Sequence, residues 1–143
     1  MKVKVINNGR NDLPEYKTIG AAGMDLRANI SKSITLKSFE RVLIGTGLRI
    51  EIPCGYEAQI RSRSGLAYMH GIICVDTPAT IDSDYRGEIH IALINLSNKD
   101  FIINSGDRIA QLILNKIENI EWEEVSELSE TERGNNGFGS TGI

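Results

Sequence analysis

The sequence lacks any apolar run that approaches the ~20 residues a membrane-spanning helix needs, and it lacks a Lys/Arg-rich run or basic stripe. We therefore expect neither a membrane protein nor a protein that binds a nucleic-acid polymer. Residues 1–6 alternate in the manner of a β-strand and do not contain the apolar core of a signal peptide. The net charge of −3 still permits a small anionic ligand, because a few well-placed arginines can bind one.

Cysteine is scarce. The two cysteines, Cys54 and Cys74, lie in or beside apolar strand-like runs and form no CxxC motif. They have no recognisable zinc-ligand spacing with His70 and His90. We therefore expect two small, reduced core residues in a cytoplasmic protein, and neither a disulfide framework nor a zinc centre.

Helical periodicity is also nearly absent. Only residues 64–69 look capable of one or two helical turns, whereas short segments rich in Ile, Val and Leu alternate with clusters of turn residues. Gly45-Thr46-Gly47 interrupts one of these segments and predicts a bulge or bend. Many short strands within 143 residues predict one all-β domain of the sandwich, jelly-roll or barrel type. The segments predicted to be strands are residues 2–6, 33–36, 40–52, 55–62, 72–75, 88–96, 100–103, 107–117 and 120–125.

The carboxyl-terminal end changes character after Ser126. It is acidic as far as Glu132 and glycine-dense from Arg133 to Gly142. Ordering such a segment costs about 1–2 kcal/mol per residue, and it has few apolar side chains to offset that cost. We therefore predict a folded domain over residues 1–126 and an arm over residues 127–143 that is mobile until something binds it.

The most informative segment is Thr80-Ile81-Asp82-Ser83-Asp84-Tyr85-Arg86-Gly87-Glu88. A carboxylate held in a tight turn, such as that of Asp82, can act as a general base toward water. The flat ring of Tyr85 can pack on a sugar or a base. Acids and glycine in a hairpin are also ordinary turn residues, so this segment does not decide the function by itself.

Two earlier segments are suited to charge and phosphate. Asp25, on a short apolar strand, can organise the waters of a cation, pin an arginine, or simply accept from turn amides. Residues 61–67 leave a strand and enter the predicted helical turn, whose exposed amides favour phosphate oxygens beside Arg63 and Ser64. The alternative for the second segment is an N-cap serine with solvated arginine neighbours.

Two later segments are also candidates. Gln111 is polar within a strongly apolar strand, so its amide faces either a polar pocket or a sheet edge. In the arm, Arg133 can pair with phosphate and Phe138 can stack on a base, while Ser140 and Thr141 can donate to phosphate oxygens. A flexible linker is the usual interpretation of such a glycine-rich composition, and the segment lacks the Lys-Ser/Thr ending of a P-loop.

These five segments, in this order, resemble the five motifs of the trimeric dUTPase family. The resemblance covers nearly the whole chain and implies an all-β, jelly-roll-like subunit that assembles into a homotrimer with shared active sites at the subunit interfaces. It implies hydrolysis of dUTP to dUMP and pyrophosphate with Mg²⁺, which keeps uracil out of DNA and supplies dUMP for thymidylate synthesis. The segments are residues 22–28, 61–67, 76–88, 106–113 and 133–142.

The resemblance also implies a role for each motif residue. Asp82 would orient and deprotonate the water that attacks the α-phosphorus, and Tyr85 would pack beneath the deoxyribose, where a 2′-hydroxyl would clash. The metal would lie mainly on phosphate oxygens and water, with Asp25 at most an outer-shell partner and no direct protein ligand. The residues implied to bind the uracil are Asp76, Thr80, Ile81 and Phe138. Those implied to hold the phosphate chain are Arg63, Ser64, Gln111, Arg133, Ser140 and Thr141, and Gly65 and Gly139 are implied to bind the substrate.

The chain departs from the family pattern at three positions. Asp76 and Ala79 stand where many members have Asn and Gly, and Ser62 stands where Pro is frequent. A rival enzyme with the same fold is dCTP deaminase, in which a glutamate after the hairpin serves the deamination, and Glu88 lies in roughly that place. A nucleotide-gated interaction protein is a third alternative, in which substrate binding orders the arm. The segment around Asp82 and the arm favour triphosphate hydrolysis over deamination. Because all the implied catalytic residues are present, the interaction protein is an added role at most.

Overall fold

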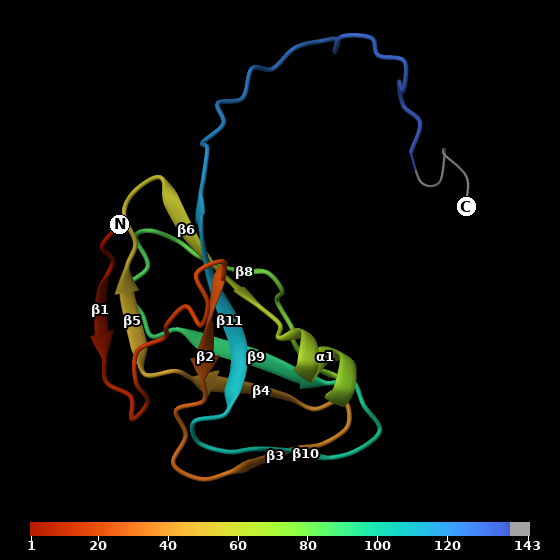
Figure 1. The fold of residues 1–143 in the computed structure, drawn as a ribbon. Helices are drawn as coiled ribbons and strands as arrows, with labels where there is room; N and C mark the ends of the chain where they lie inside the picture. The colour runs from red at the N-terminus through yellow and green to blue at the C-terminus, as the bar shows by residue number, and fades with distance from the viewer. Residues whose placement is uncertain (138–143) are drawn as a thin grey trace.

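The structure, a computed structural model, describes residues 1–137, which fold into eleven strands and one short helix (Figure 1). The elements are β1 (Lys4–Asn7), β2 (Gly23–Arg27), β3 (Ile34–Leu36), β4 (Arg41–Gly45), β5 (Leu48–Glu51), β6 (Tyr56–Arg61), α1 (Ser64–His70), β7 (Ile72–Cys74), β8 (Ala79–Ile81), β9 (His90–Asn95), β10 (Phe101–Ile103) and β11 (Arg108–Lys116). The helical segment found among these residues is far too short to cross a membrane.

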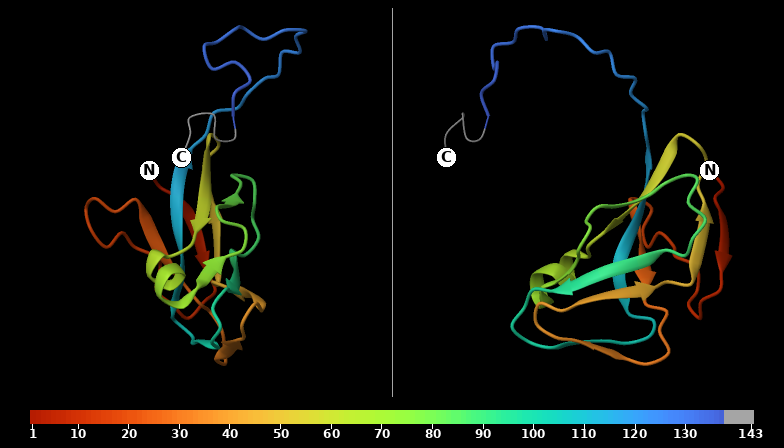
Figure 2. Two further views of the ribbon diagram at one scale, coloured as in Figure 1. Left: turned by 90° about the vertical axis from the view of Figure 1, so that its right-hand side faces the viewer. Right: turned by 180° about the vertical axis from the view of Figure 1, so that it is seen from behind.

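The strands form small antiparallel sheets, seen from two sides in Figure 2. One sheet has four strands in the order β2-β11-β6-β8, and another has three in the order β4-β9-β7. β1 pairs with β5, and β3 pairs with β10. None of these sheets closes on itself, and the predicted all-β, jelly-roll-like fold is confirmed.

One hydrophobic core joins these sheets. Successive residues of a strand point to opposite faces of the sheet, so every second side chain faces the core, and these side chains are mostly apolar. In β9, Ile91 and Leu93 are fully buried while His90 is exposed. Leu26 of β2 and Ile60 of β6 enter the same core from the four-stranded sheet. Burying each such side chain contributes about 1.5–3 kcal/mol, which makes the strand scaffold rigid enough to present turns at fixed positions.

The predicted bend at Gly45-Thr46-Gly47 is confirmed. It separates β4 from β5, and Gly47 has a positive φ of 77°. A Cβ atom at Gly47 would lie 2.4 Å from the Cα of Gly9, so both backbone conformation and space require glycine there. The predicted helix is also confirmed over Ser64–His70, and Gly71 ends it in the left-handed conformation with φ 68°.

The predicted strand over residues 120–125 is wrong. β11 ends at Lys116, and residues 118–137 are exposed and extend away from the strands without further helix or strand (Figure 1). Ile120 and Trp122 alternate with acidic residues, but a strand forms only where a neighbouring strand accepts its hydrogen bonds, and in this chain they are 69% and 87% exposed. The domain boundary at residue 126 stays a prediction.

The cysteines differ from one another. Cys74, at the end of β7, is fully buried, as predicted for a core residue. Cys54 is exposed, so the prediction is wrong for that residue. The reason is local, because Cys54 lies in the turn between β5 and β6, where Gly55 has a positive φ of 83° and the chain reverses at the surface.

A buried amide fixes the end of β9. Asn95 is fully buried, and its Nδ2 donates to the carbonyl of Leu36 at 2.9 Å and to that of Lys99 at 2.7 Å. Its Oδ1 accepts from the Ser97 main-chain N–H at 2.9 Å and from Ser97 Oγ at 2.7 Å. Such a satisfied buried amide costs little, whereas its removal leaves several polar groups unpaired.

Candidate active site

Three charged side chains from distant parts of the chain meet beside α1. Asp25 lies on β2, Arg63 directly precedes α1, and Arg108 begins β11. Arg63 Nε donates to Asp25 Oδ1 at 2.9 Å, and Arg108 Nη1 donates to Asp25 Oδ2 at 3.3 Å. Arg63 Nη1 also donates to the main-chain carbonyl of Arg108 at 3.0 Å. Of the alternatives predicted for Asp25, the structure thus shows the pinning of an arginine.

Strand register places Gln111 next to these side chains. On β11 it pairs with Asp25 of β2 on one side and with Arg61 of β6 on the other. Directly paired residues of antiparallel strands have Cβ atoms about 4.5–5.5 Å apart. β11 is an inner strand of the four-stranded sheet, so Gln111 does not lie at a sheet edge. Of the two predicted environments for its amide, the sheet edge is therefore excluded, and the half-buried Gln111 side chain lies in register with the polar residues Asp25 and Arg61.

The start of α1 adds main-chain donors to this arrangement. Arg63 is the N-cap residue, with extended backbone (φ −85°, ψ 128°) and no side-chain cap hydrogen bond. Ser64 is consequently the first helical residue, and its interpretation as an N-cap is wrong. Ser64 and Gly65 are exposed, and first-turn amides have no intrahelical acceptor. They can donate to an anion that also contacts Arg63.

The candidate segment over residues 80–88 forms a separate turn beside the other edge of β6, the edge that pairs with β8. β8 pairs with β6, so that Thr80 lies opposite Gln59 and Ile81 opposite Ala58. Asp82 follows directly and is exposed, and its carbonyl accepts from the Tyr85 N–H at 3.1 Å, which closes the turn. Asp76 is exposed at the start of the same segment. The turn therefore presents an exposed carboxylate directly after β8.

The two arrangements lie at opposite ends of β6. Asp82 comes just after the residue that pairs with Ala58, whereas Arg63 lies two residues beyond Arg61. At ~3.3 Å per residue, Ala58 and Arg61 alone are about 10 Å apart along the strand, and Asp82 and Arg63 lie beyond them in opposite directions. The Arg63 side chain also turns toward β2 and β11, away from β8. Within a single chain, Asp82 and Arg63 therefore do not lie close together.

A family model described as dUTPase matches residues 9–142. This chain is a member of the dUTPase family. It is 58% identical to the deoxyuridine 5′-triphosphate nucleotidohydrolase of Fusobacterium nucleatum over 142 residues, covering 99% of this chain and 97% of that protein. It is 59% identical to the enzyme of the same name from Finegoldia magna over 142 residues, covering 99% of each.

Solved dUTPases share the fold. A mutant dUTPase of Staphylococcus bacteriophage 80alpha with dUpNHpp matches with a TM-score of 0.89 at 25% identity and covers 99% of both chains. A mutant dUTPase from phage phi11 of S. aureus, which coordinates a structural Mg(II) ion, matches with a TM-score of 0.82 at 22% identity. The second likeness shows the fold alone.

Glu88, a candidate base in the deaminase alternative, is engaged elsewhere in this dUTPase. Its Oε1 accepts from the Gly47 main-chain N–H at 2.8 Å, and a Cβ atom at Gly45 would lie 2.4 Å from the same oxygen. The carboxylate is thus packed into the bend between β4 and β5. A general base must reach the proton it removes, and this geometry does not favour Glu88 in that role.

The Asp25 carboxylate, the one considered for the metal, is occupied by arginine side chains. Among residues 1–137 there is no group of three or more His, Cys, Asp or Glu side chains placed to hold a metal ion. Both Asp25 oxygens accept from guanidinium groups. Mg²⁺ commonly binds through substrate phosphates and water with one or two carboxylates, and the residues present fit that mode better than a direct protein cage.

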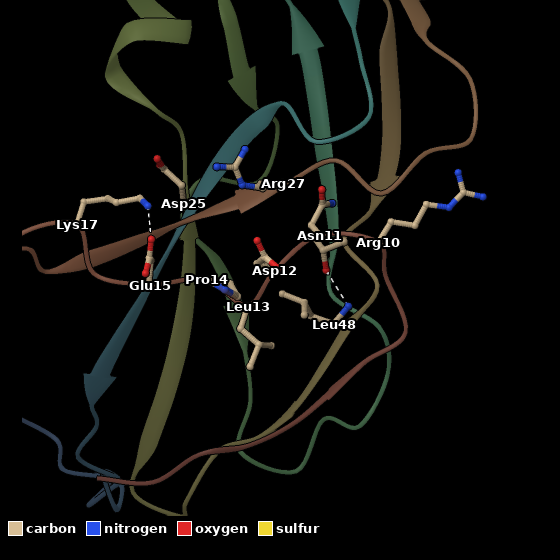
Figure 3. Close-up of a pocket in the computed structure, with 11 residues that line it drawn as sticks. Arg10, Asn11, Asp12, Leu13, Pro14, Glu15, Lys17, Asp25, Arg27 and Leu48 are labelled. Atoms are coloured by element: carbon tan, nitrogen blue, oxygen red, sulfur yellow. Dashed lines mark hydrogen bonds and ion pairs between the residues drawn. The ribbon is translucent and has the colours of Figure 1, made fainter.

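One pocket includes Asp25 but neither Arg63 nor Arg108. It has a volume of about 520 Å³ and is lined by the loop over residues 10–17 together with Asp25 and Arg27 of β2 (Figure 3). A hydrogen bond from Lys17, together with its charge, lowers the pKa of Glu15 at the rim. Apart from Asp25, it includes none of the predicted site residues. Arg63 and Arg108 instead line a second pocket of about 260 Å³.

The sequence prediction missed Arg108 and could not place the arm. Arg108 lies three residues before Gln111 in the fourth motif segment, but its contact with Asp25 spans 83 positions and leaves no local pattern. In the arm, Arg133 Nε donates to the Asn136 carbonyl at 2.9 Å on the exposed chain. The predicted residues outside the described part are Phe138, Gly139, Ser140 and Thr141.

Proposed function

We propose that this chain hydrolyses dUTP to dUMP and pyrophosphate. The observation that carries the proposal is that the family match, over residues 9–142, includes both the exposed Asp82 turn and the cluster of Arg63, Asp25 and Arg108. The first supplies a base, and the second supplies fixed positive charge for a polyphosphate. By keeping dUTP scarce in the cytoplasm, the enzyme would keep uracil out of DNA and supply dUMP for thymidylate synthesis.

We infer that the functional unit is a homotrimer in which each site combines residues of different subunits. The separation of Asp82 from Arg63 along β6 supports this, because neither can complete a site within one chain. The exposed apolar side chains of Ile120 and Trp122 also support it, since large exposed apolar side chains often mark contact surfaces. In this arrangement Arg63 and Gln111 of one subunit face Asp82 of a neighbour, and the arm comes from the third subunit.

The reaction is an in-line displacement at the α-phosphorus. A water oxygen attacks phosphorus, the bond to the bridging oxygen breaks, and pyrophosphate leaves with the negative charge. Asp82 holds the water and takes its proton, a task that requires the oxygen about 3–3.5 Å from phosphorus. Arg63, Gln111 and the amides of Ser64 and Gly65 hold the phosphate chain. Bound Mg²⁺ supplies further neutralisation of the triphosphate charge.

The hairpin over residues 76–85 supplies specificity. Main-chain groups near Thr80 and Ile81, with Asp76, would pair with the uracil edge, and Phe138 of the arm would cover it. A site that pairs with one base edge can reject a mismatched base by about 10⁴–10⁵, because buried polar groups are then left unpaired. Tyr85, 43% exposed, would pack beneath the deoxyribose. Arg133, Gly139, Ser140 and Thr141 of the arm would hold the γ-phosphate.

The proposal is tested by pyrophosphate release from dUTP, dCTP, dTTP and UTP in the presence of Mg²⁺. We expect turnover of dUTP alone and its loss in Asp82→Asn, which keeps the shape of the side chain but removes the base. Asp84→Asn in the same exposed turn is the matched control and should retain activity. Turnover that survives in Asp82→Asn would remove Asp82 from the mechanism. Ammonia release from dCTP would instead favour the deaminase alternative.

Mixing two inactive variants tests the shared site. Asp82→Asn and Arg63→Ala chains would be unfolded together, mixed in equal amounts and refolded. If each site takes these residues from different subunits, about a quarter of the sites in random trimers contain both intact residues, and activity returns to that extent. No recovery, with trimers present by light scattering, would mean that Asp82 and Arg63 act from one chain or not at all.

A further inference from the structure

The hydroxyl end of the Tyr85 ring lies against the main chain of two nearby residues, Gly87 and Glu88. Its hydroxyl donates to the carbonyl of Glu88 at 3.0 Å. The ring also lies against Gly87, where a Cβ atom would be 2.2 Å from Tyr85 Oη and 2.4 Å from Cζ. Gly87 does not have a positive φ, so its backbone would accept alanine. The space occupied by the Tyr85 ring is therefore what requires glycine at position 87.

Glu88 is itself anchored to the bend between β4 and β5. Its carboxylate accepts from the Gly47 N–H at 2.8 Å, and the neighbouring Ile89 carbonyl accepts from Thr46 Oγ1 at 2.8 Å. The Ile89 N–H donates to the Leu48 carbonyl at 2.8 Å. Glu88 and Ile89 are thus tied at several points to a bend that lies about forty positions earlier in the chain.

We propose that Gly87 and Glu88 are positioning residues that hold the Tyr85 ring against the sugar and so set discrimination between deoxyribose and ribose. This inference rests on the proposed function. The Glu88 carbonyl accepts the hydrogen bond of the tyrosine hydroxyl. The Glu88 carboxylate holds this residue, and so its carbonyl, against the bend between β4 and β5. Gly87, which has no Cβ, leaves room for the ring.

The physical reason is stiffness. A ring rejects a 2′-hydroxyl only if it cannot retreat, because a shift of about 1 Å would relieve the clash. Tyr85 is 43% exposed, so packing alone leaves much of the ring free to move. A hydroxyl bond to a carbonyl that is itself anchored removes that freedom. Loosening the anchor should therefore change kcat/KM for UTP and for dUTP by different factors. A loss of overall stability would change both by the same factor.

The test compares kcat/KM for dUTP and for UTP in full-length variants. Glu88→Ala keeps the carbonyl but loses the anchor, and we expect it to lower the dUTP-to-UTP ratio about 10–100-fold. Gly87→Ala, which displaces the ring, should lower it similarly. Glu88→Gln retains an oxygen acceptor for the Gly47 N–H and should restore most of the ratio. The matched control is Glu40→Ala, which removes a carboxylate that accepts from the Lys37 N–H at 2.9 Å and should leave the ratio unchanged.

A spectroscopic readout separates this inference from the proposed function. In ring-labelled protein the Tyr85 ring, assigned with Tyr85→Phe, should show a nuclear Overhauser effect to the Gly87 Hα protons that weakens in Glu88→Ala. An absent effect in the wild type overturns the inference whether or not dUTP is hydrolysed. An unchanged ratio in both Glu88→Ala and Gly87→Ala also overturns it, provided that the wild type turns over dUTP. Failure of wild-type turnover counts against the proposed function alone.

Discussion

Replacing Asp25 by asparagine isolates the charge that holds the two arginines. The substitution keeps the size of the side chain and an oxygen acceptor for Arg63 Nε, now 2.9 Å from Oδ1. It removes the negative charge between Arg63 and Arg108 and places an amide donor or a weaker acceptor opposite Arg108. The two guanidinium groups would then repel each other with nothing between them to offset the repulsion.

The expected cost follows from partial burial. The side chains of Asp25 and Arg63 are 19% and 23% exposed, and that of Arg108 is 46% exposed. Charged hydrogen bonds contribute about 1.5–3 kcal/mol when well buried, and solvent screening reduces this. We expect a loss of about 1–2 kcal/mol in the free energy of unfolding, or about 3–6 °C in Tm at fixed protein concentration.

The functional effect should exceed the stability effect. A neutral amide oxygen holds Arg63 less tightly than the carboxylate does, so its guanidinium spends less time in the position in which it would meet the phosphate chain, and kcat/KM for dUTP should fall about 10–100-fold. The assay measures kcat/KM in Asp25→Asn over a range of Mg²⁺ concentrations. Asp107→Asn is the control. It also neutralises a carboxylate, but one whose Oδ2 accepts from the Asn104 N–H at 2.7 Å and not from an arginine.

Two outcomes would refute this reasoning. If Asp25→Asn lowers Tm but leaves kcat/KM within about twofold of wild type, the ion pairs are structural and do not position Arg63. If excess Mg²⁺ restores the lost activity, Asp25 acts mainly as an outer-shell partner of the metal, the role that the family resemblance allows for it. A loss independent of Mg²⁺, with the Asp107→Asn control near wild type, supports the positioning of the arginines.

Three further outcomes can be measured directly. Burial raises the pKa of the Cys74 thiol above its usual range, so as the pH rises through the range in which a free thiol titrates only the unfolded chain releases this proton. The resulting fall in the free energy of unfolding should be smaller in Cys74→Ala and unchanged in Cys54→Ala. Asn95→Ala should cost about 2 kcal/mol in chemical denaturation because the buried Leu36 carbonyl loses its side-chain donor and the Ser97 N–H loses its acceptor, whereas the exposed Asn98→Ala should be neutral. A chain that ends at residue 126 should keep its Tm within about 2 °C but bind dUTP more weakly, and an unchanged KM would exclude the arm from the site.

Local patterns were enough to predict most strands and the helix. Alternation in β9 and a long apolar run in β11 identify core strands because side-chain direction repeats every two residues. The same pattern over residues 120–125 failed, since alternation describes a side-chain arrangement and does not supply a hydrogen-bonding neighbour. β8 went unrecognised as a separate strand because Ala79–Ile81 is too short to show a period.

The candidate site was predictable as a set of segments but not as an arrangement. Arg63, Gln111 and Asp82 each stand in a suggestive local setting, but their separation along β6 depends on register between strands that are distant in sequence. Arg108 carries no distinguishing pattern and becomes visible only through its contact with Asp25. Glu88 was ambiguous in the sequence because nothing local shows that its carboxylate turns back onto Gly47.

The packing of Glu88 against the bend restricts how this sequence can change over evolutionary time. A methyl group at Gly45 would push the Glu88 carboxylate away from the Gly47 N–H, so alanine at position 45 loses this anchor unless position 88 changes as well. Position 87 likewise opens to larger residues only when Tyr85 has been lost, and with it the ring under the sugar. The order of substitutions therefore matters here. Drift at these positions would proceed by paired exchanges, and single substitutions taken first would lead through less fit intermediates.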